Sequence, residues 1–372
     1  MPHSLAAATF TATYRVRSTA AEIEARATAI AVEQSIEMPV VAVEDAWVRD
    51  TIIGRVEAIT DPGQGLFEAR IRFSADTVGA DPGQLLNMLF GNSSIQDDVT
   101  LIDVDLPASL LSTFGGPHHG AAGLRQRVGA HGRALTASAL KPQGLPTDQL
   151  AALAGRLAAG GLDYIKDDHG LADQSFSPFS ARVPAIAKAV RAASLGTGRA
   201  TRYLPSLSGT LDAMRHQLAI VRQEGVDCVL IAPMVTGVAA FHALVIEHPE
   251  IAFIAHPAMA GAARIAPPVH FGKLFRLFGA DGVVYPNFGG RFSYSPDTCR
   301  AIVAAGAAPW GDLKAALAIP AGGMTAQRVP ELLDFYGVDV MLLIGGGLLA
   351  AGKDLTAATA RFVQAVESYR YA

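Results

Sequence analysis

The feature that most constrains the fold is a regular alternation of short apolar runs and amphipathic segments from Arg133 onward. Eight apolar runs of strand length begin at Ala134, Gly161, Arg202, Asp227, Ile251, Asp281, Ala318 and Val340. Segments with helical periodicity follow them at 147–160, 178–194, 210–225, 238–249, 270–279, 296–306, 325–337 and 355–370. This α/β pattern, at roughly 30-residue spacing, predicts a closed (β/α)8 TIM barrel. A doubly wound open sheet is the alternative, but the GxGxxG loop expected after its first strand is absent from the sequence.

The preceding part of the chain has a different pattern. Strand-length runs at 11–18, 54–60, 67–73 and 99–107 are interspersed with helical patterns at 20–34 and 81–91. This mixture predicts a small α+β domain of the ferredoxin-like type over residues 1–125, followed by the barrel as the catalytic domain over residues 126–372. The Gly- and His-rich stretch 114–132 is interpreted as a loop-heavy linker.

The composition excludes several classes of protein. Half of the residues are hydrophobic and 17% are charged, which is typical of a globular chain. The net charge of −4, without a Lys/Arg-rich run, argues against a nucleic-acid partner. The apolar runs are shorter than the about 20 residues of a membrane-spanning helix, so we expect a soluble, cytoplasmic protein with no membrane partner. Cys228 and Cys299 lie in apolar and helical patterns, which argues against a disulfide framework or a cysteine metal site.

The residues at the carboxyl ends of the predicted strands are the candidates for chemistry, because those ends surround the active-site mouth of a barrel. They are Lys141 after the first strand, Lys166-Asp167-Asp168-His169 at the second, His256 at the fifth, Asn287 to Arg291 after the sixth, Gly322-Gly323 at the seventh and Gly345-Gly346-Gly347 at the eighth.

The glycines at the last two strand ends predict a phosphate site. Gly322, Gly323, Gly345 and Gly346 let backbone N–H groups approach an anion closely on two adjacent strands. The alternative is that these glycines only turn the chain.

The two lysines are candidates for a base, a Schiff-base amine or an anion partner, since a lysine at the end of an apolar strand is costly to bury without a function or a partner. For Lys166, an ion pair with Asp163 or Asp167 is the structural alternative. His256 has a position suited to an acid or a base. Lys166, Asp168 and His169 also resemble a metal-ligand cluster.

The segment Gly160–His169, which reads GGLDYIKDDH, resembles the GGxDFxKDDE pattern of RuBisCO. The resemblance covers most of the chain. Further motifs that carry it are Asn87 to Asn92, Leu140-Lys141-Pro142, Tyr203 to Thr210, Pro320-Ala321-Gly322-Gly323 and Gly345-Gly346-Gly347. The chain is thus similar to the RuBisCO-like proteins (form IV), and most to their 5-methylthioribulose-1-phosphate isomerase group.

This resemblance implies roles for individual residues. Lys166 would be carbamylated, and with Asp168 and His169 it would hold Mg²⁺. Lys141 would be the base that enolises a sugar phosphate. Asn92 would reach from one subunit into its partner's active site, which implies an obligate homodimer with shared sites.

Several departures from the RuBisCO pattern argue against carbon fixation. His169 replaces a metal-binding glutamate, which favours a softer divalent metal or none. Arg291 takes the place of the lysine that orients CO₂, although it remains a candidate substrate-binding residue. The other differences are Gln143 for a lysine, Pro257 for an arginine, Ala260 for a histidine, and Met38 and Pro39 around one phosphate. One phosphate site, a base and a candidate metal site remain.

The resulting functional hypothesis is an enolising enzyme that isomerises 5-methylthioribulose 1-phosphate in methionine salvage. The alternatives are a decarboxylase of a branched 3-oxo sugar-acid phosphate and a diketo-methylthiopentyl-phosphate enolase. A non-catalytic structural or regulatory dimer is the alternative of another class. The retention of Lys141 and Lys166 argues against this alternative, because a scaffold has no physical need for lysines at the mouth of a barrel.

Overall fold

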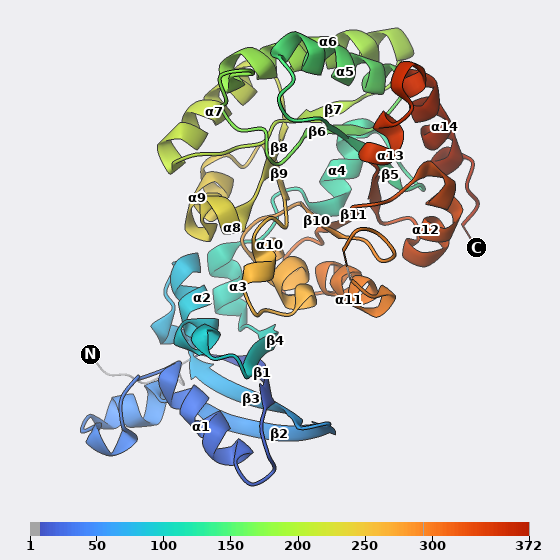
Figure 1. Cartoon of the computed structure of the whole chain (residues 1–372). Coiled ribbons are helices and arrows are strands. Elements are labelled where there is room, and N and C mark those ends of the chain that lie inside the picture. Colours follow the sequence, from blue (N-terminus) through green and yellow to red (C-terminus); the bar gives the residue numbers. More distant parts are fainter. Residues whose placement is uncertain (1–7, 293, 372) are drawn as a thin grey trace.

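A computed structural model of the chain describes residues 8–292 and 294–371. Its two parts are arranged as Figure 1 shows, with the N-terminal sheet at one end and the barrel at the other. Among the described residues, no helix has the length and apolar character needed to cross a membrane.

The N-terminal part has the ferredoxin-like order of elements. These are β1 (Thr9–Arg17), α1 (Ile23–Glu33), β2 (Arg55–Gly63), β3 (Leu66–Ser74), α2 (Pro82–Phe90) and β4 (Val99–Asp105). The strands form an antiparallel sheet in the order β2-β3-β1-β4. Alternate residues of β1 are buried, and the Tyr14 hydroxyl donates to the Leu89 carbonyl of α2 at 2.6 Å. The predicted α+β fold is confirmed, because period-two burial on β1 gives the helices an apolar face to cover.

Eight parallel strands form the barrel. They are β5 (Leu135–Leu140), β6 (Tyr164–Asp167), β7 (Arg202–Leu204), β8 (Cys228–Ile231), β9 (Ala252–Ala255), β10 (Gly282–Pro286), β11 (Leu317–Ala321) and β12 (Met341–Leu343). They pair in the order β7-β6-β5-β12-β11-β10-β9-β8. The ring closes between β7 and β8, where Leu207 N–H donates to the Leu230 carbonyl at 2.8 Å and Leu230 N–H donates to the Pro205 carbonyl at 2.9 Å. The predicted closed barrel is confirmed.

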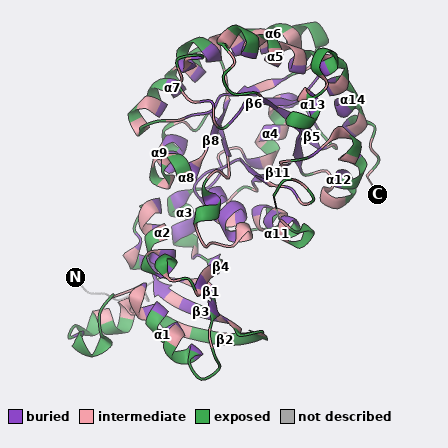
Figure 2. Cartoon of the chain, viewed as in Figure 1, coloured by how far each residue is buried: buried purple, intermediate pink, exposed green. Residues whose placement is uncertain are grey.

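Helices surround these strands. The longer ones are α5 (Thr147–Ala159), α6 (Phe179–Thr197), α7 (Leu211–Gln223), α9 (Val238–Glu247), α11 (Pro296–Ala307), α12 (Val329–Tyr336) and α14 (Leu355–Glu367). Shorter turns are α8 (Pro233–Thr236), η5 (Ala260–Ala262), η6 (Pro268–Leu274), α10 (Phe275–Leu277), η7 (Ala326–Arg328), α13 (Gly346–Leu349) and η8 (Gly352–Asp354). Buried residues concentrate in the strands and on the inner faces of the helices, as Figure 2 shows, and exposed residues lie outside.

The stretch 114–132 corrects the linker interpretation. It contains the end of α3 (Ala108–Phe114) and a nine-residue helix, α4 (Gly120–Val128). Leu124 and Val128, one helical turn apart, are buried in the same cluster as the inward side chains of the barrel strands. The carboxylate of Asp281 accepts the N–H groups of His119 and Gly120 at 2.7 and 2.6 Å. Three of the glycines that suggested a loop, Gly115, Gly120 and Gly129, are therefore helix ends, and α4 packs against the barrel core near the start of β10.

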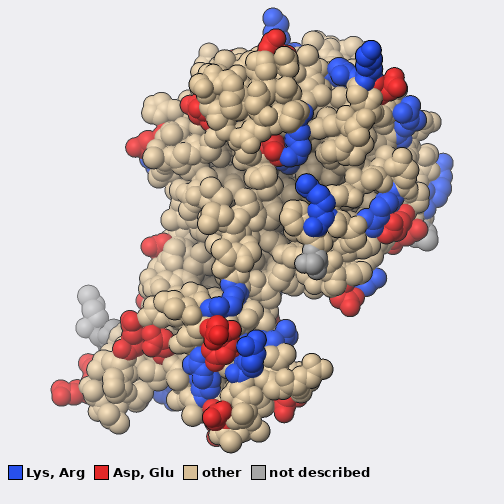
Figure 3. All heavy atoms as spheres, in the orientation of Figure 1, with Lys and Arg blue, Asp and Glu red and all other residues tan. Residues whose placement is uncertain are grey.

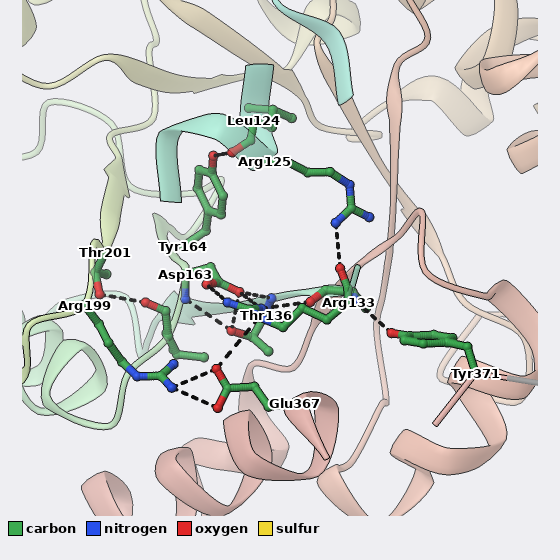
Figure 4. A network of polar contacts seen from close by, with 12 residues as sticks. Leu124, Arg125, Arg133, Thr136, Asp163, Tyr164, Arg199, Thr201, Glu367 and Tyr371 are labelled. Atoms are coloured by element: carbon green, nitrogen blue, oxygen red, sulfur yellow. Dashed lines mark hydrogen bonds and ion pairs between the residues drawn. The ribbon is translucent and has the colours of Figure 1, made fainter. Parts of the chain in front are cut away.

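A polar network fixes the starts of β5 and β6 near this end (Figure 4). The Asp163 carboxylate, just before β6, accepts two hydrogen bonds of 2.7 Å from Arg133. It also accepts the N–H and hydroxyl of Thr136 at 2.8 and 2.9 Å. Because Asp163 is 3% exposed, this charge is held by partners instead of water.

The surface carries both signs of charge. On the face shown in Figure 3, the Lys and Arg side chains of the described residues are scattered over the barrel or stand beside Asp and Glu. The N-terminal sheet pairs Arg15 with Glu68 and Arg70 with Glu57 at 2.8 and 3.2 Å.

Candidate active site

One pocket collects the predicted site residues. Its volume is about 920 Å³, and it opens where the barrel strands end. Its walls include ten of the residues singled out from the sequence, namely Lys141, Lys166, Asp168, His169, His256, Arg291, Gly322, Gly323, Gly345 and Gly346. They come from loops far apart in the chain, and barrel closure brings them together.

An ion pair spans the first two strand ends. The Lys141 ammonium, which follows β5, lies 2.7 Å from Asp168 Oδ1, which follows β6. Burial alone would raise the pKa of Asp168, but the hydrogen bonds from His169 and Lys141 and the charge of Lys166 hold it below its ordinary value. Asp168 is therefore a carboxylate that orients Lys141.

Lys166 lies beside this pair without an ion pair of its own to Asp163 or Asp167. Its ammonium donates to the Asp167 backbone carbonyl at 2.8 Å. The Asp163 carboxylate belongs to the network with Arg133, and the Asp167 carboxylate accepts from Arg182 Nε at 3.2 Å. The alternative prediction for Lys166, an ion pair with Asp163 or Asp167, is therefore wrong. Burial, with the nearby charge of Lys141, lowers the pKa of Lys166 to about 8.

Strand alternation explains why Lys166 and Asp167 have separate surroundings. Lys166 faces the pocket, whereas Asp167 faces the helices outside the barrel. There the Asp167 carboxylate also accepts the Tyr203 hydroxyl at 2.8 Å and the Ser206 N–H at 3.1 Å. This buried cluster positions Asp167, whose backbone carbonyl accepts the hydrogen bond from Lys166. Sequence reasoning missed Arg182, which belongs to the cluster.

Two histidine rings form one wall of the pocket. The rings of His169 and His256 stack with centroids 4.3 Å apart and planes 10° apart. Burial, with the charges of Lys166 and His169, lowers the pKa of His256 to about 2, so this imidazole is neutral and weakly basic. Its Nδ1 accepts the Ala258 N–H at 3.2 Å, which places the ring proton on Nε2.

The glycines at the ends of β11 and β12 have no side chains, so their backbone faces the pocket directly. Gly322 and Gly323 have φ of +91° and +83°, a conformation that favours glycine. A Cβ on Gly323 would lie 2.9 Å from the Arg291 backbone nitrogen. A Cβ on Gly345 would lie 4.0 Å from Lys141 Cε, so this glycine edge adjoins the candidate base.

Apolar side chains that sequence reasoning did not identify as pocket residues line another part of the pocket. They are Pro257, Ala258, Met259, Phe271, Val284, Tyr285, Phe292 and Tyr294. Phe271 and Tyr294 come from different segments, with ring centroids 6.5 Å apart. The only signal in the sequence was the replacement of an expected arginine by Pro257 and of an expected histidine by Ala260.

The unmodified side chains do not fit the expected magnesium site. Mg²⁺ takes hard oxygen ligands in octahedral geometry. Lys166 offers nitrogen, His169 offers a ring nitrogen stacked on His256, and the Asp168 carboxylate already pairs with Lys141. Within residues 8–292 and 294–371, no group of three or more His, Cys, Asp and Glu side chains has the arrangement of a metal site. We therefore derive no step through a metal.

Asn92 does not line this pocket, and neither do the strand-end candidates Asp167 and Asn287, which are buried away from it. Asn92 lies in η4 (Asn92–Ile95) of the N-terminal part, where its side-chain amide donates to Glu33 at 2.9 Å and to Glu37 at 2.7 Å.

Sequence comparison identifies the family. The profile of the ribulose bisphosphate carboxylase large chain, catalytic domain, matches residues 120–370. The chain belongs to the RuBisCO large-chain family. This match begins at α4, the helix that packs against the barrel core.

Within the family, the chain is similar to RuBisCO-like proteins. It is 60% identical over 356 residues to a Rhodospirillum rubrum protein named 5-methylthioribulose-1-phosphate isomerase, covering 95% of each chain. It is 32% identical over 299 residues to a Geobacillus kaustophilus 2,3-diketo-5-methylthiopentyl-1-phosphate enolase, covering 77% of this chain and 72% of the relative. The crystal structure of a Rubisco-like protein from Rhodopseudomonas palustris superposes with a TM-score of 0.92 at 53% identity, covering 98% of this chain and 99% of that one.

Proposed function

We propose that this chain is an enolising isomerase of 5-methylthioribulose 1-phosphate. The observation that carries the proposal is the adjacency of a glycine edge and a lysine in one pocket, at Gly345 and Lys141. A monophosphate bound at the glycines places its carbon chain next to the amine. The 60% identical relative with this activity in its name supports the same substrate.

The proposed reaction moves one proton between two neighbouring carbons of the sugar and one between their oxygens. The neutral amine of Lys141 removes a proton from the carbon next to the carbonyl, and the electron pair of the broken C–H bond forms an enediolate. The resulting Lys141 ammonium is held by Asp168. Return of this proton to the other carbon of the enediolate, together with transfer of the hydroxyl proton between the two enediolate oxygens, regenerates the amine and completes an isomerisation. In the ligand-free protein Lys141 is paired with Asp168, so one proton must leave this amine before the first turnover.

Hydrogen-bond donors can stabilise the negative charge that develops on the substrate oxygens. His256 carries its proton on Nε2, because Nδ1 accepts the Ala258 N–H. Lys166, which lines the same pocket, adds a second donor. Such preorganised donors act on the enediolate more strongly than on the neutral ketone. Arg291 and the four glycines are the proposed phosphate contacts.

We further propose a homodimer with shared active sites. Asn92 is exposed, lies outside its own chain's pocket and is oriented by Glu33 and Glu37. A site on a partner subunit gives this oriented amide a function that its own barrel does not.

The test is product analysis with purified protein. We expect 5-methylthioribulose 1-phosphate to give a rearranged monophosphate in ³¹P and ¹H NMR, without release of CO₂ or inorganic phosphate. Conversion of a diketo-methylthiopentyl phosphate or a branched sugar-acid phosphate instead would replace the isomerase with an enolase or a decarboxylase.

A further inference from the structure

The loop that follows β10 is joined to the end of β11 by backbone hydrogen bonds. It runs from Asn287 to Phe292 and carries Arg291, whose side chain lines the pocket. Asn287 N–H donates to the Ala321 carbonyl at 2.8 Å, and Arg291 N–H donates to the Gly322 carbonyl at 3.4 Å. The position of this loop therefore decides where Arg291 lies relative to the glycines that end β11.

Two glycines in the loop permit its close contact with β11. Gly289 has φ of +63°, a conformation that favours glycine. A Cβ on Gly290 would lie 1.9 Å from the Gly322 carbonyl oxygen, so a side chain at this position would push the loop away from β11. Glycine loses more conformational freedom on folding than other residues do. The loop therefore needs contacts from neighbouring elements to hold one conformation.

The first of these contacts comes from the last residue of α12. The Tyr336 hydroxyl donates to Asn287 Oδ1 at 2.6 Å, and Asn287 Nδ2 donates to the Phe288 carbonyl at 2.8 Å. Asn287 is fully buried, so water cannot easily take the place of this hydroxyl. A buried acceptor that loses its partner is costly. Tyr336 therefore fixes the first residue of the loop, although it does not itself line the pocket.

The second contact comes from the turn that precedes α12. Arg328 has its Cζ atom 5.4 Å from the ring centroid of Phe288, and its Nη1 donates to the carbonyls of Phe288 and Gly289 at 3.5 and 3.4 Å. Glu331 accepts from Arg328 Nε and Nη2 at 2.9 and 2.6 Å. A planar guanidinium that is held at two nitrogens has its remaining donors in fixed directions. Arg328 therefore holds the middle of the loop.

Arg300 provides a comparison within the same group of side chains. Its Cζ atom lies 4.5 Å from the ring centroid of Phe335, and this ring packs against Phe288 with centroids 4.4 Å apart. Arg300 donates to Asp297 of its own helix, α11, at 3.0 Å. The two aromatic rings thus contact one arginine that bonds to the loop backbone and one whose ion pair lies within a helix.

We infer that Tyr336 and Arg328 are positioning residues, which hold the loop after β10 so that Arg291 meets the phosphate group of the substrate. This inference rests on the proposed function for that phosphate. Without these contacts, ligand binding would have to order the loop, which weakens affinity. Lys141 follows β5, which is separated from β11 by β12, so the proton transfer should be nearly unaffected.

Two single substitutions test the inference. Tyr336→Phe removes the hydroxyl, and Arg328→Gln removes the guanidinium. With 5-methylthioribulose 1-phosphate, we expect KM to rise at least about fivefold in each variant while kcat changes by less than about twofold. Affinity for inorganic phosphate, measured by ³¹P NMR titration, should fall at least about threefold. A role confined to folding would lower the thermal midpoint without separating KM from kcat.

Limited proteolysis reports on the loop itself and needs no substrate. Trypsin cleaves after arginine, so the bond between Arg291 and Phe292 becomes accessible when the loop leaves β11. We expect cleavage at this bond, followed by mass spectrometry under native conditions, to be at least about fivefold faster in both variants.

Two matched controls make the same chemical changes away from the loop. Arg300→Gln removes the other guanidinium of the aromatic group, and Tyr369→Phe removes a hydroxyl that donates to the exposed Asp334 of α12. Both should stay within about twofold of the wild type in KM, phosphate affinity and cleavage rate.

The outcomes separate this inference from the proposed function. Unchanged KM, phosphate affinity and cleavage in both variants would overturn it, as would equal effects in the controls. Faster cleavage with unchanged phosphate affinity also overturns it, because the loop would then be anchored without positioning a phosphate contact. A wild-type protein that binds inorganic phosphate but does not convert 5-methylthioribulose 1-phosphate removes only the isomerase, since phosphate affinity and cleavage still test the two residues.

Discussion

The ammonium of Lys141 and the carboxylate of Asp168 lie 2.7 Å apart at the mouth of the barrel. The contact joins the ends of β5 and β6, which pair in parallel from Ala137 to Leu140. The same Asp168 carboxylate contacts His169, while Lys166 lies beside it. The Asp168 carboxylate thus holds Lys141 and His169 in place beside Lys166.

Lys141→Met should abolish proton exchange and retain ligand binding. The substitution keeps an unbranched side chain of similar length but removes the amine, so we expect exchange to fall by at least about a thousandfold. Affinity for a sugar phosphate should change by less than about fivefold, because the glycines at the ends of β11 and β12 are unchanged. Deuterium exchange and calorimetry measure the two quantities. Lys188→Met, on the exposed face of α6, is the matched control, and full exchange in the Lys141 variant would remove its assignment as the base.

Substitutions at Gly345 should weaken phosphate binding in proportion to their size. An added Cβ would lie 3.9 Å from Ala139 Cβ and 4.0 Å from Lys141 Cε, which is ordinary contact, and φ is −93°. Gly345→Ala should therefore fold normally and lose little affinity, whereas Gly345→Val adds methyl groups where the phosphate is proposed to bind. We expect the valine variant to bind at least about tenfold more weakly. Unchanged affinity in both variants would exclude this edge as the phosphate site.

Binding of Mg²⁺ should require CO₂. The unmodified side chains supply one carboxylate, already paired with Lys141, so we expect weak Mg²⁺ binding in bicarbonate-free buffer. A carbamate on Lys166 would add the oxygens that the set lacks. Bicarbonate should then tighten Mg²⁺ binding by at least about tenfold, with a carbamate signal in ¹³C NMR, and Lys166→Met should show neither effect. Tight Mg²⁺ binding without bicarbonate would contradict this prediction.

Asp163→Asn should destabilise the barrel without acting on the pocket. Asp163 accepts two hydrogen bonds from Arg133 and two from Thr136, and the amide of asparagine would place a donor among these donors. Loss of one member of a buried ion pair costs about 3–5 kcal/mol. The urea midpoint at fixed protein concentration measures the effect. Asp339→Asn, which changes a carboxylate that is 78% exposed beside Arg125, should change stability by less than about 0.5 kcal/mol.

The sequence predicted most of the barrel because its strands are short, apolar and regularly spaced. It also predicted ten of the pocket residues, since a closed parallel barrel brings its strand ends to one mouth. The helix α4 was missed because its end glycines, Gly120 and Gly129, are typical of loops as well as of helix ends.

The apolar wall of the pocket was harder to predict. Phe271 comes from η6, and nothing in its local pattern distinguishes a side chain that lines a pocket from one in the core. The pairing of Lys141 with Asp168, in place of Lys166 with Asp163 or Asp167, depends on which face of β6 each side chain occupies. Arg133 and Arg182, the actual partners of Asp163 and Asp167, are defined only by the tertiary structure.

The most direct test of the central claim is deuterium incorporation by the wild-type protein, followed by ¹H NMR in D₂O with 5-methylthioribulose 1-phosphate. We predict deuterium on a carbon next to the carbonyl, together with a rearranged monophosphate, and neither in Lys141→Met. Folded wild-type protein that binds this compound but incorporates no deuterium, with and without Mg²⁺ and bicarbonate, would contradict an enolising isomerase.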